Sequence, residues 1–445
     1  MIPTTSVWSE NPAVAYPSLP QGTTRADVAI IGGGLSGLSA AYHLLESRPG
    51  ARIVVLEADR LGAGASGRTT GMLGPGVGQS FASLVKRLGH SKAQALYRAT
   101  LRAVEYVRDL VGAEGIECDL EMTGQLVIAR SNGSLARLAA QAALFDGCQF
   151  PYEALDDGGL ARCIRLSPAT ERTRPERGPA ALRLPLAGIL HPMKLVAALA
   201  ERVISRGGLI FEGTRAARLS DGRPVRIEVE GGGEVIAADV VAATAGYTPG
   251  IGLLHGRILP VHLQVLVTEP LTGAARDAVG WRGREGILDA RRVFNYFRLT
   301  ADDRIVFGGG SPRYRWGGRT GGRDADGAVA LERLRGEMLR TLPAGASPAI
   351  AKGWTGVIGY VADAIPAIQR SKRNPAVVHV VGWCGHGVAL SVASGQWVSA
   401  LICDGAANED LPWFRNDLPL IPSEVARWVG FQSSVRMMSW LDRSF

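Results

Sequence analysis

A glycine-rich segment near the amino terminus has the residue types and spacing that suit pyrophosphate binding. Gly32, Gly34 and Gly37 form the pattern G-x-G-x-x-G, and Glu57 follows 20 residues after Gly37. Such glycines permit a tight turn, close approach of backbone amides to phosphate oxygens and close packing of a helix on a sheet, while the later acid binds ribose hydroxyls. The acid also repels a 2′-phosphate, which disfavours NADP. We therefore expect a dinucleotide site that includes Gly32, Gly34, Leu35, Ser36, Gly37, Glu57 and Ala58.

The motif works only between a strand and a helix, and the flanking residues predict this arrangement. Residues 27–31 are an apolar run, residues 35–47 have helical spacing, and residues 52–56 are a β-branched run that ends at Glu57. This order predicts a parallel strand–helix–strand crossover. Parallel-sheet material resumes with a helix at 193–206 and strands at 209–211, 240–244 and 377–381.

Other segments predict a second sheet with antiparallel pairing. Strands are expected at 262–268, 293–299 and 304–307, with a turn at Asp302-Asp303 between the last two. Helical spacing marks residues 83–111, 328–342 and 388–402. The predicted fold class is therefore α/β, with a Rossmann-like dinucleotide-binding domain and a second α+β domain built on an antiparallel sheet.

The segment that follows Glu57 distinguishes one dinucleotide from another. Residues 62–72 read G-A-G-A-S-G-R-T-T-G-M and resemble the G-A-S-G-R region of the D-amino acid oxidase superfamily of FAD enzymes. In that superfamily the region wraps the pyrophosphate and reaches the flavin. The resemblance implies FAD contacts from Gly64, Ala65, Ser66, Arg68, Thr69, Thr70, Gly71 and Met72. A glycine- and serine-rich surface loop is the alternative for this segment taken alone.

Three later segments extend the resemblance over most of residues 24–405 and are most similar to the gamma-glutamylputrescine oxidase branch. They are a small-residue strand and turn at 240–248, a hairpin at 295–310, and the motifs at 354–356 and 382–391. A buried strand is the alternative for the first of them. The resemblance implies further cofactor contacts from Ala245, Gly246, Gly356, Gly385, His386, Gly387, Val388 and Ala389.

The chemistry of residues 385–389 agrees with that assignment. Gly385 and Gly387 permit close backbone approach, and the helix from Val388 presents unpaired amides and the positive end of its dipole. At the N1 and O2 edge of the flavin, where the family places them, these groups would stabilise the negative charge of reduced flavin. His386 either contacts the cofactor or is a hydrogen-bonded structural histidine in a tight turn.

The family resemblance also implies a reaction. A hydride passes from the carbon that bears a neutral amine to flavin N5, and water hydrolyses the resulting imine. Tyr296 and Arg298 share one face of a predicted strand, so one is a candidate to stack on a substrate and the other to hold a carboxylate. Solvated surface residues are the alternative. Trp354 is a candidate roof for the pocket, with a place in the core as its alternative.

Two departures from the sarcosine oxidase branch bear on the oxidant and on the cofactor linkage. That branch has a lysine for oxygen activation where this chain has Ile305-Val306-Phe307, which puts the use of oxygen in doubt. It also tethers flavin to a cysteine where this chain has Lys352-Gly353, so non-covalent FAD is expected. Cys384, which replaces a commoner serine, is a hypothetical flavin-proximal thiol.

Alternative functions are a D-amino acid or glycine dehydrogenase with a non-oxygen acceptor, or a non-catalytic FAD-binding subunit.

The resemblance and the predicted elements together suggest a discontinuous domain organisation. Residues 24–80, 186–250 and 352–410 would form the FAD-binding domain, and residues 81–185 and 251–351 the substrate domain. Residues 411–445 would be a helical tail, rich in tryptophan, that packs on the body or lies on a membrane surface as an interfacial helix.

Composition narrows the classes of partner. The formal net charge is +8, but the arginines are scattered, which argues for solubility more than for nucleic-acid binding. Five cysteines without a C-x-x-C pair argue against a disulfide framework and a metal site. The first 20 residues lack the features of a signal peptide, and a cytoplasmic protein is expected. The expected partner is a small amine; the oligomeric state is left open.

Overall fold

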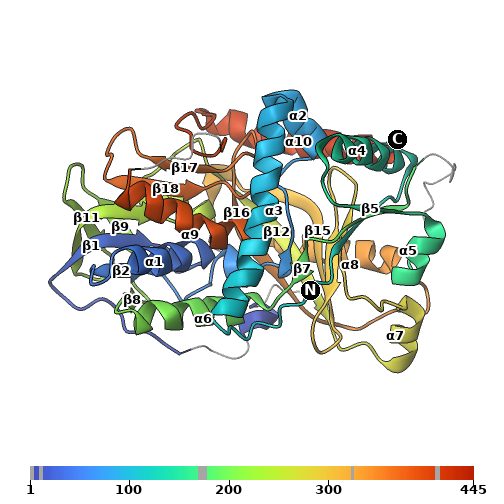
Figure 1. The fold of residues 1–445 in the computed structure, drawn as a ribbon, viewed down its shortest axis with the longest axis horizontal. Coiled ribbons are helices and arrows are strands. Elements are labelled where there is room, and N and C mark those ends of the chain that lie inside the picture. Colours follow the sequence, from blue (N-terminus) through green and yellow to red (C-terminus); the bar gives the residue numbers. More distant parts are fainter. Residues whose placement is uncertain (1–4, 10–13, 169–177, 322–324, 406–410, 445) are drawn as a thin grey trace.

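A computed structural model describes residues 5–9, 14–168, 178–321, 325–405 and 411–444. Two large sheets organise the fold, with α3 (His90–Ala113) running across the molecule between their regions (Figure 1). The predicted α/β class, a Rossmann-like sheet joined to a second sheet, is confirmed.

The first sheet carries the dinucleotide motif. β1 (Thr23–Ile31) lies at its centre and pairs in parallel with β2 (Ile53–Leu56) and β11 (Glu234–Ala242). β8 (Leu209–Phe211) and β18 (Val377–Val381) extend it in parallel on the two sides, and β17 (Ala367–Arg370) pairs antiparallel with β18. The predicted crossover is confirmed: β1 leads through α1 (Leu35–Ser47) to β2. The remaining members are β10 (Val225–Val229), which forms a hairpin with β11, and β9 (Ala216–Leu219).

Three helices pack on this sheet: α1, α6 (Pro192–Ser205) and α9 (Gly387–Cys403). Nearly every residue of α1 is buried, since α6 and α9 both contact it. Gly395 allows a backbone-to-backbone approach, because a Cβ there would lie 2.3 Å from the carbonyl oxygen of Ser39. The amino ends of α1 and α9 are thereby held close to each other.

The second sheet is antiparallel except for one parallel pair, β4 with β13. The predicted hairpin at Asp302-Asp303 joins β14 to β15, but β14 begins at Tyr296, because the residues before it form a loop. Helix α8 (Ala325–Thr341) contacts β12, β15 and β16. The strand order is β16 (Ile350–Tyr360), β12 (Leu259–Thr268), β15 (Ile305–Tyr314), β14 (Tyr296–Leu299), β13 (Gly286–Asp289), β4 (Gln125–Ile128), β6 (Ala181–Leu184) and β5 (Glu153–Leu155).

Two expectations about segments need correction. The helix expected at 83–111 is two helices, α2 (Phe81–Leu88) and α3, because Gly89 adopts a φ of 78°. α3 was expected to belong with the second sheet. It packs instead on α9, in the same core cluster as the helices of the first sheet. β16 pairs with β12 along its length, so residues 352–360, which were expected to belong with the FAD-binding part, lie in the second sheet.

The shorter elements complete the chain. The tail ends in α10 (Glu424–Ser444), which contacts β15 and the 3-10 turn at Trp316–Gly318, so packing of the tail on the body is confirmed. The others are β3 (Met72–Leu73), β7 (Gly188–Ile189), α4 (Asn132–Cys148), α5 (Asp157–Cys163), α7 (Gly273–Val279) and the 3-10 turns at Val7–Ser9, Ala65–Gly67 and Ala245–Ile251.

Candidate active site

A cavity of about 970 Å³ runs from the dinucleotide motif, past the amino ends of α1 and α9, to a wall made by β12, β14 and α10. It brings together most of the residues predicted as cofactor contacts. Those that line it are Gly32, Gly34, Leu35, Ser36, Glu57, Ala58, Gly64, Ala65, Ser66, Arg68, Thr69, Thr70, Met72, Ala245, Gly246, Gly356, Gly385, His386, Gly387 and Val388. Three predicted contacts, Gly37, Gly71 and Ala389, are not among the residues that line the cavity.

The glycines of the motif are required by packing. Gly32 has a φ of 113°, and a Cβ at Gly37 would lie 1.9 Å from the carbonyl oxygen of Gly32. A Cβ at Gly34 would point into the cavity lining, 2.8 Å from the Ser66 hydroxyl oxygen. The first turn of α1 therefore stays open to the cavity because these positions carry no side chain.

Glu57 is held in place before any ligand arrives. Its carboxylate accepts hydrogen bonds from the backbone nitrogens of Gly33 at 2.8 Å and Asp59 at 3.0 Å. Burial nevertheless raises the pKa of the Glu57 carboxyl above its usual value. A partly buried acid just after β2, fixed by two amides, is well placed to accept hydrogen bonds from a ribose.

Three successive carbonyls of the segment at 62–72 are held by side chains outside the cavity lining. The indole nitrogen of Trp354 donates to the carbonyl of Arg68 at 2.9 Å, and that of Trp8 donates to the carbonyl of Thr69 at 2.7 Å. Arg298 donates to the carbonyl of Thr70 at 2.7 Å. The backbone that borders the cavity is thus fixed from behind.

Two predicted substrate residues therefore have a different role from the one expected. Arg298 is 2% exposed, and its guanidinium also donates to the carbonyls of Leu190 at 2.6 Å and Leu299 at 3.0 Å. Each of its three nitrogens donates to a backbone carbonyl, and Arg298 is not among the residues that line the cavity, so it is not placed to hold a substrate carboxylate. Trp354 is fully buried against Trp8 and Val265 and lies in the core, not over the pocket. Tyr296 does line the cavity.

The turn before α9 faces the same cavity. His386 is the N-cap residue of α9 without a side-chain cap hydrogen bond, and its Nδ1 is buried without a partner. Burial lowers the pKa of His386, so the imidazole is neutral at physiological pH. The indole nitrogen of Trp383 donates to the Ser36 hydroxyl at 3.0 Å, which ties this turn to the first turn of α1.

Cys384 lies in the same turn with a φ of 49° and lines the cavity. Its sulfur accepts a hydrogen bond from the backbone nitrogen of Val361 at 3.4 Å. Burial raises the pKa of this thiol to about 12, so it is not a ready nucleophile.

Sequence reasoning missed the residues that form the far wall. The loop between β13 and β14 contributes Arg292, Val293 and Phe294, and α10 contributes Phe431, Ser434, Val435 and Met438. On β12, every second residue from Leu259 to Val265 lines the cavity, as strand geometry leads one to expect. The sequence of the tail has no such pattern that indicates which face of α10 meets the cavity.

The fold and cavity define a flavoprotein oxidoreductase with a Rossmann-like nucleotide site. Residues 27–401 match the family of FAD dependent oxidoreductases (DAO), and the chain belongs to this family. It is 29% identical over 407 residues to the gamma-glutamylputrescine oxidoreductase of Escherichia coli, with 90% of this chain and 89% of that protein covered. It is also 29% identical over 415 residues to a probable oxidoreductase, OrdL, of Haemophilus influenzae, with 88% and 86% covered.

Solved structures show the same fold. The glycine oxidase of Geobacillus kaustophilus superposes with a TM-score of 0.71 at 20% identity, covering 88% of this chain and 99% of that chain. The L-proline dehydrogenase of P. horikoshii gives a TM-score of 0.69 at 19% identity, covering 89% and 97%. In the part of the chain that the structure describes, no helix is long and apolar enough to cross a membrane.

The cavity fits the FAD of this family. The first residues of α1 and α9 line the cavity, and the N-cap residues Gly34 and His386 make no side-chain cap hydrogen bond. The Leu35 amide donates to the Ser66 hydroxyl at 3.0 Å, so Ser66 belongs to the α1 end of the site. Gly34 leaves room that a Cβ would fill, and Glu57 stands where a ribose is expected. The α1 end suits the pyrophosphate and the α9 end the flavin edge.

Proposed function

We propose that the protein oxidises the carbon–nitrogen bond of a small amine or amino acid. The observation that carries this proposal is the continuity of the cavity from the nucleotide motif, past the α9 turn, to a chamber bounded by Phe294, Tyr296 and α10. FAD supplies the two-electron oxidant when bound. The protein contributes a chamber that would hold the substrate carbon next to the flavin.

The charges around the cavity favour an uncharged amine. Among the described lining residues, the carboxylates are Glu57, Asp59 and Glu230, and all three lie at the nucleotide end. The chamber end instead has Arg292 and Arg427 among its lining residues. Because an ammonium group there would be desolvated and would find no carboxylate among the described lining residues beside it, its pKa would fall. A neutral amine is the form that can be oxidised.

Arg292 also favours a substrate with a distal carboxylate. It stands in the loop before β14 and is only weakly paired, with 3.5 Å between its Nη1 and the Asp442 carboxylate. This arrangement supports an amino acid over a simple amine, with the carboxylate toward the loop.

Tyr296 supports the proposal as a flat, neutral wall. A Cβ at Gly308 would lie 2.3 Å from its ring, so the glycine makes room for the phenol on the neighbouring strand. Burial raises the pKa of Tyr296 to about 12, so the hydroxyl stays protonated at physiological pH. A protonated phenol can donate a hydrogen bond to the substrate but does not repel an amine lone pair by charge.

The test is anaerobic mixing of the FAD-loaded protein with a panel of amines, D- and L-amino acids and glycine. Bleaching of the flavin absorbance by one compound class supports the proposal and identifies the substrate. If no member bleaches a flavin that light and a chemical reductant do reduce, the non-catalytic FAD-binding subunit is the better account. Repetition in air separates an oxidase from a dehydrogenase with another acceptor.

We also propose that the outer face of α10 contacts an anionic membrane surface. Val425, Trp428, Val429 and Met437 are exposed on this helix, and Trp316 is exposed beside Trp428 at a ring distance of 6.1 Å. Exposed tryptophans beside apolar side chains suit an interfacial position, and the net charge of +8 suits acidic lipids. Cosedimentation with phosphatidylglycerol vesicles tests this idea, and a protein that stays in the supernatant at low salt would refute it.

A further inference from the structure

The loop between β13 and β14 carries the chamber residues Arg292, Val293 and Phe294, so its shape decides what the chamber accepts. The inner side of the loop is fixed by Asp289, a buried acid at the end of β13. Its carboxylate accepts hydrogen bonds from the backbone nitrogens of Arg291 at 3.2 Å and Asn295 at 3.0 Å and pairs with the Arg291 guanidinium at 2.6 Å.

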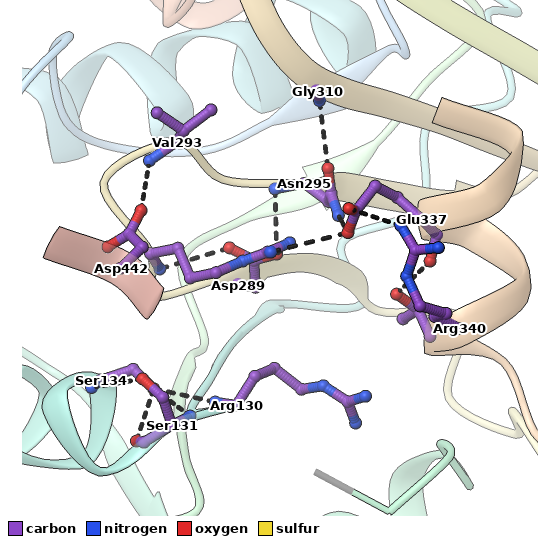
Figure 2. A network of polar contacts seen from close by, with 12 residues as sticks. Arg130, Ser131, Ser134, Asp289, Val293, Asn295, Gly310, Glu337, Arg340 and Asp442 are labelled. Carbon is purple, nitrogen blue, oxygen red and sulfur yellow. Dashed lines mark hydrogen bonds and ion pairs between the residues drawn. The ribbon is translucent and has the colours of Figure 1, made fainter. Parts of the chain in front are cut away.

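The outer side of the loop is fixed by a residue from the other end of the chain. Asp442, near the end of α10, is 6% exposed, and its carboxylate accepts hydrogen bonds from the backbone nitrogens of Arg292 at 2.8 Å and Val293 at 2.9 Å. Figure 2 shows the Asp442 carboxylate turned toward the backbone at Val293. Arg137 of α4 and the Arg292 side chain complete the surroundings of Asp442, each at 3.5 Å.

α10 is anchored at its first residue as well. Glu424 accepts hydrogen bonds from the backbone nitrogen of Gly317 at 2.6 Å and the hydroxyl of Tyr314 at 3.0 Å. Between the two anchors, Phe431, Val435 and Met438 line the chamber. The helix lies beyond residues 27–401, the part of the chain that matches the family model.

We propose that Asp442 is a positioning residue for substrate recognition: it holds the 290–294 loop from outside and thereby sets where Arg292 and Phe294 stand in the chamber. The α10 helix is accordingly part of the substrate site. This inference rests on the proposed oxidation of an amine or amino acid. Amide hydrogen bonds to a charged, buried carboxylate are among the stronger ones in proteins, so their loss frees the loop.

The test compares Asp442→Ala and Asp442→Asn with wild type, with Asp417→Asn as the control. Asp417 lies in the same tail but is 81% exposed and pairs with Arg415 at 3.5 Å. We expect Asp442→Ala to raise KM for the best substrate about tenfold with a much smaller change in kcat. Asp442→Asn, which keeps one acceptor oxygen, should lie between wild type and Asp442→Ala, and Asp417→Asn should match wild type.

A second readout does not depend on turnover. Trypsin cuts after arginine, and release of the loop should speed cleavage after Arg291 or Arg292 in Asp442→Ala while the flavin absorbance stays unchanged. Unchanged cleavage and unchanged KM would overturn the inference, as would faster cleavage with unchanged KM. A fall in KM would also overturn it, because Asp442 would then only weaken the charge of Arg292. If no amine reduces the flavin, the proposed function fails, and unchanged cleavage would then also refute the hold on the loop.

Discussion

The guanidinium of Arg298 donates a 2.7 Å hydrogen bond to the carbonyl oxygen of Thr70, which lies 228 residues earlier in the chain. This bond links β14 of the second sheet to the segment that borders the cofactor cavity. Together with the bonds from Trp354 and Trp8, it fixes the backbone at three successive positions. The second sheet therefore shapes the cofactor site as well as the substrate chamber.

Arg298→Lys should lower stability without a specific effect on substrate binding. A lysine ammonium cannot reproduce the planar fork that serves three carbonyls, so the free energy of unfolding should fall by about 2 kcal/mol or more, and FAD should dissociate more readily. Thermal denaturation and FAD titration measure both effects. A variant with wild-type stability and FAD affinity but a strongly raised KM for a carboxylate substrate would restore the role first expected for Arg298.

Gly37→Ala should disrupt the nucleotide turn. Its methyl group would meet the carbonyl oxygen of Gly32 at 1.9 Å, so the backbone must shift, at a cost of about 1–3 kcal/mol. We expect loss of bound FAD on purification, measured by absorbance. Gly112→Ala in α3 is the matched control, because nothing lies within 4 Å of its added Cβ and alanine should stabilise the helix by about 0.5–1 kcal/mol. Equal FAD retention in both variants would contradict the packing argument.

Glu57→Gln should weaken cofactor binding and leave the apoprotein close to wild-type stability. Because burial raises the folded pKa of Glu57, the folded state favours the protonated acid, and the wild-type apoprotein loses stability as the pH rises through the ordinary carboxyl range toward the folded pKa. The glutamine variant lacks this loss, which offsets the hydrogen bond that it cannot accept from one of the two backbone amides, so at neutral pH its apoprotein should melt close to wild type. Its FAD dissociation constant should rise about tenfold, because a charged acceptor for the ribose is gone. A clearly lower melting temperature of the apoprotein together with unchanged FAD affinity would contradict both the stability prediction and the binding prediction.

FAD should be released by acid precipitation, because the thiol nearest the cavity is unreactive. With a pKa of about 12, Cys384 is almost entirely protonated at pH 8. Iodoacetamide should therefore leave Cys384 unmodified in the folded protein and modify it after denaturation, as mass spectrometry of its peptide would show. Yellow colour retained on the acid precipitate would refute non-covalent binding.

The nucleotide half of the site could be predicted because its requirements are local. Gly32, Gly34 and Gly37 with Glu57 need only a strand, a turn and a helix in sequence order, and α1 has the predicted limits. The roles of Arg298 and Trp354 could not be predicted, because they depend on which carbonyls the distant 68–70 backbone presents. Strand alternation placed Tyr296 and Arg298 on one face of a strand but did not give the neighbours that this face meets.

The far wall could not be predicted for a related reason. Apolar side chains lie on every side of α10 and alternate with polar ones. The sequence therefore does not distinguish the face with Phe431 and Met438 from the face with Val425 and Val429. The pairing of Asp442 with backbone amides 149 and 150 residues earlier has no local pattern. Gly89 shows the opposite case, in which one glycine with a positive φ interrupts an otherwise regular helical pattern.

The tight crossing of α1 and α9 at Ser39 and Gly395 has a consequence for cofactor selection. A side chain at Gly395 would collide with Ser39, and the Ser39 hydroxyl donates to the carbonyl of Val392, so the two helices form one rigid block. We expect one amino end to meet the phosphates of FAD and the other its ring system. The spacing of the two ends would then be fixed, so the protein would select a cofactor long enough to reach both.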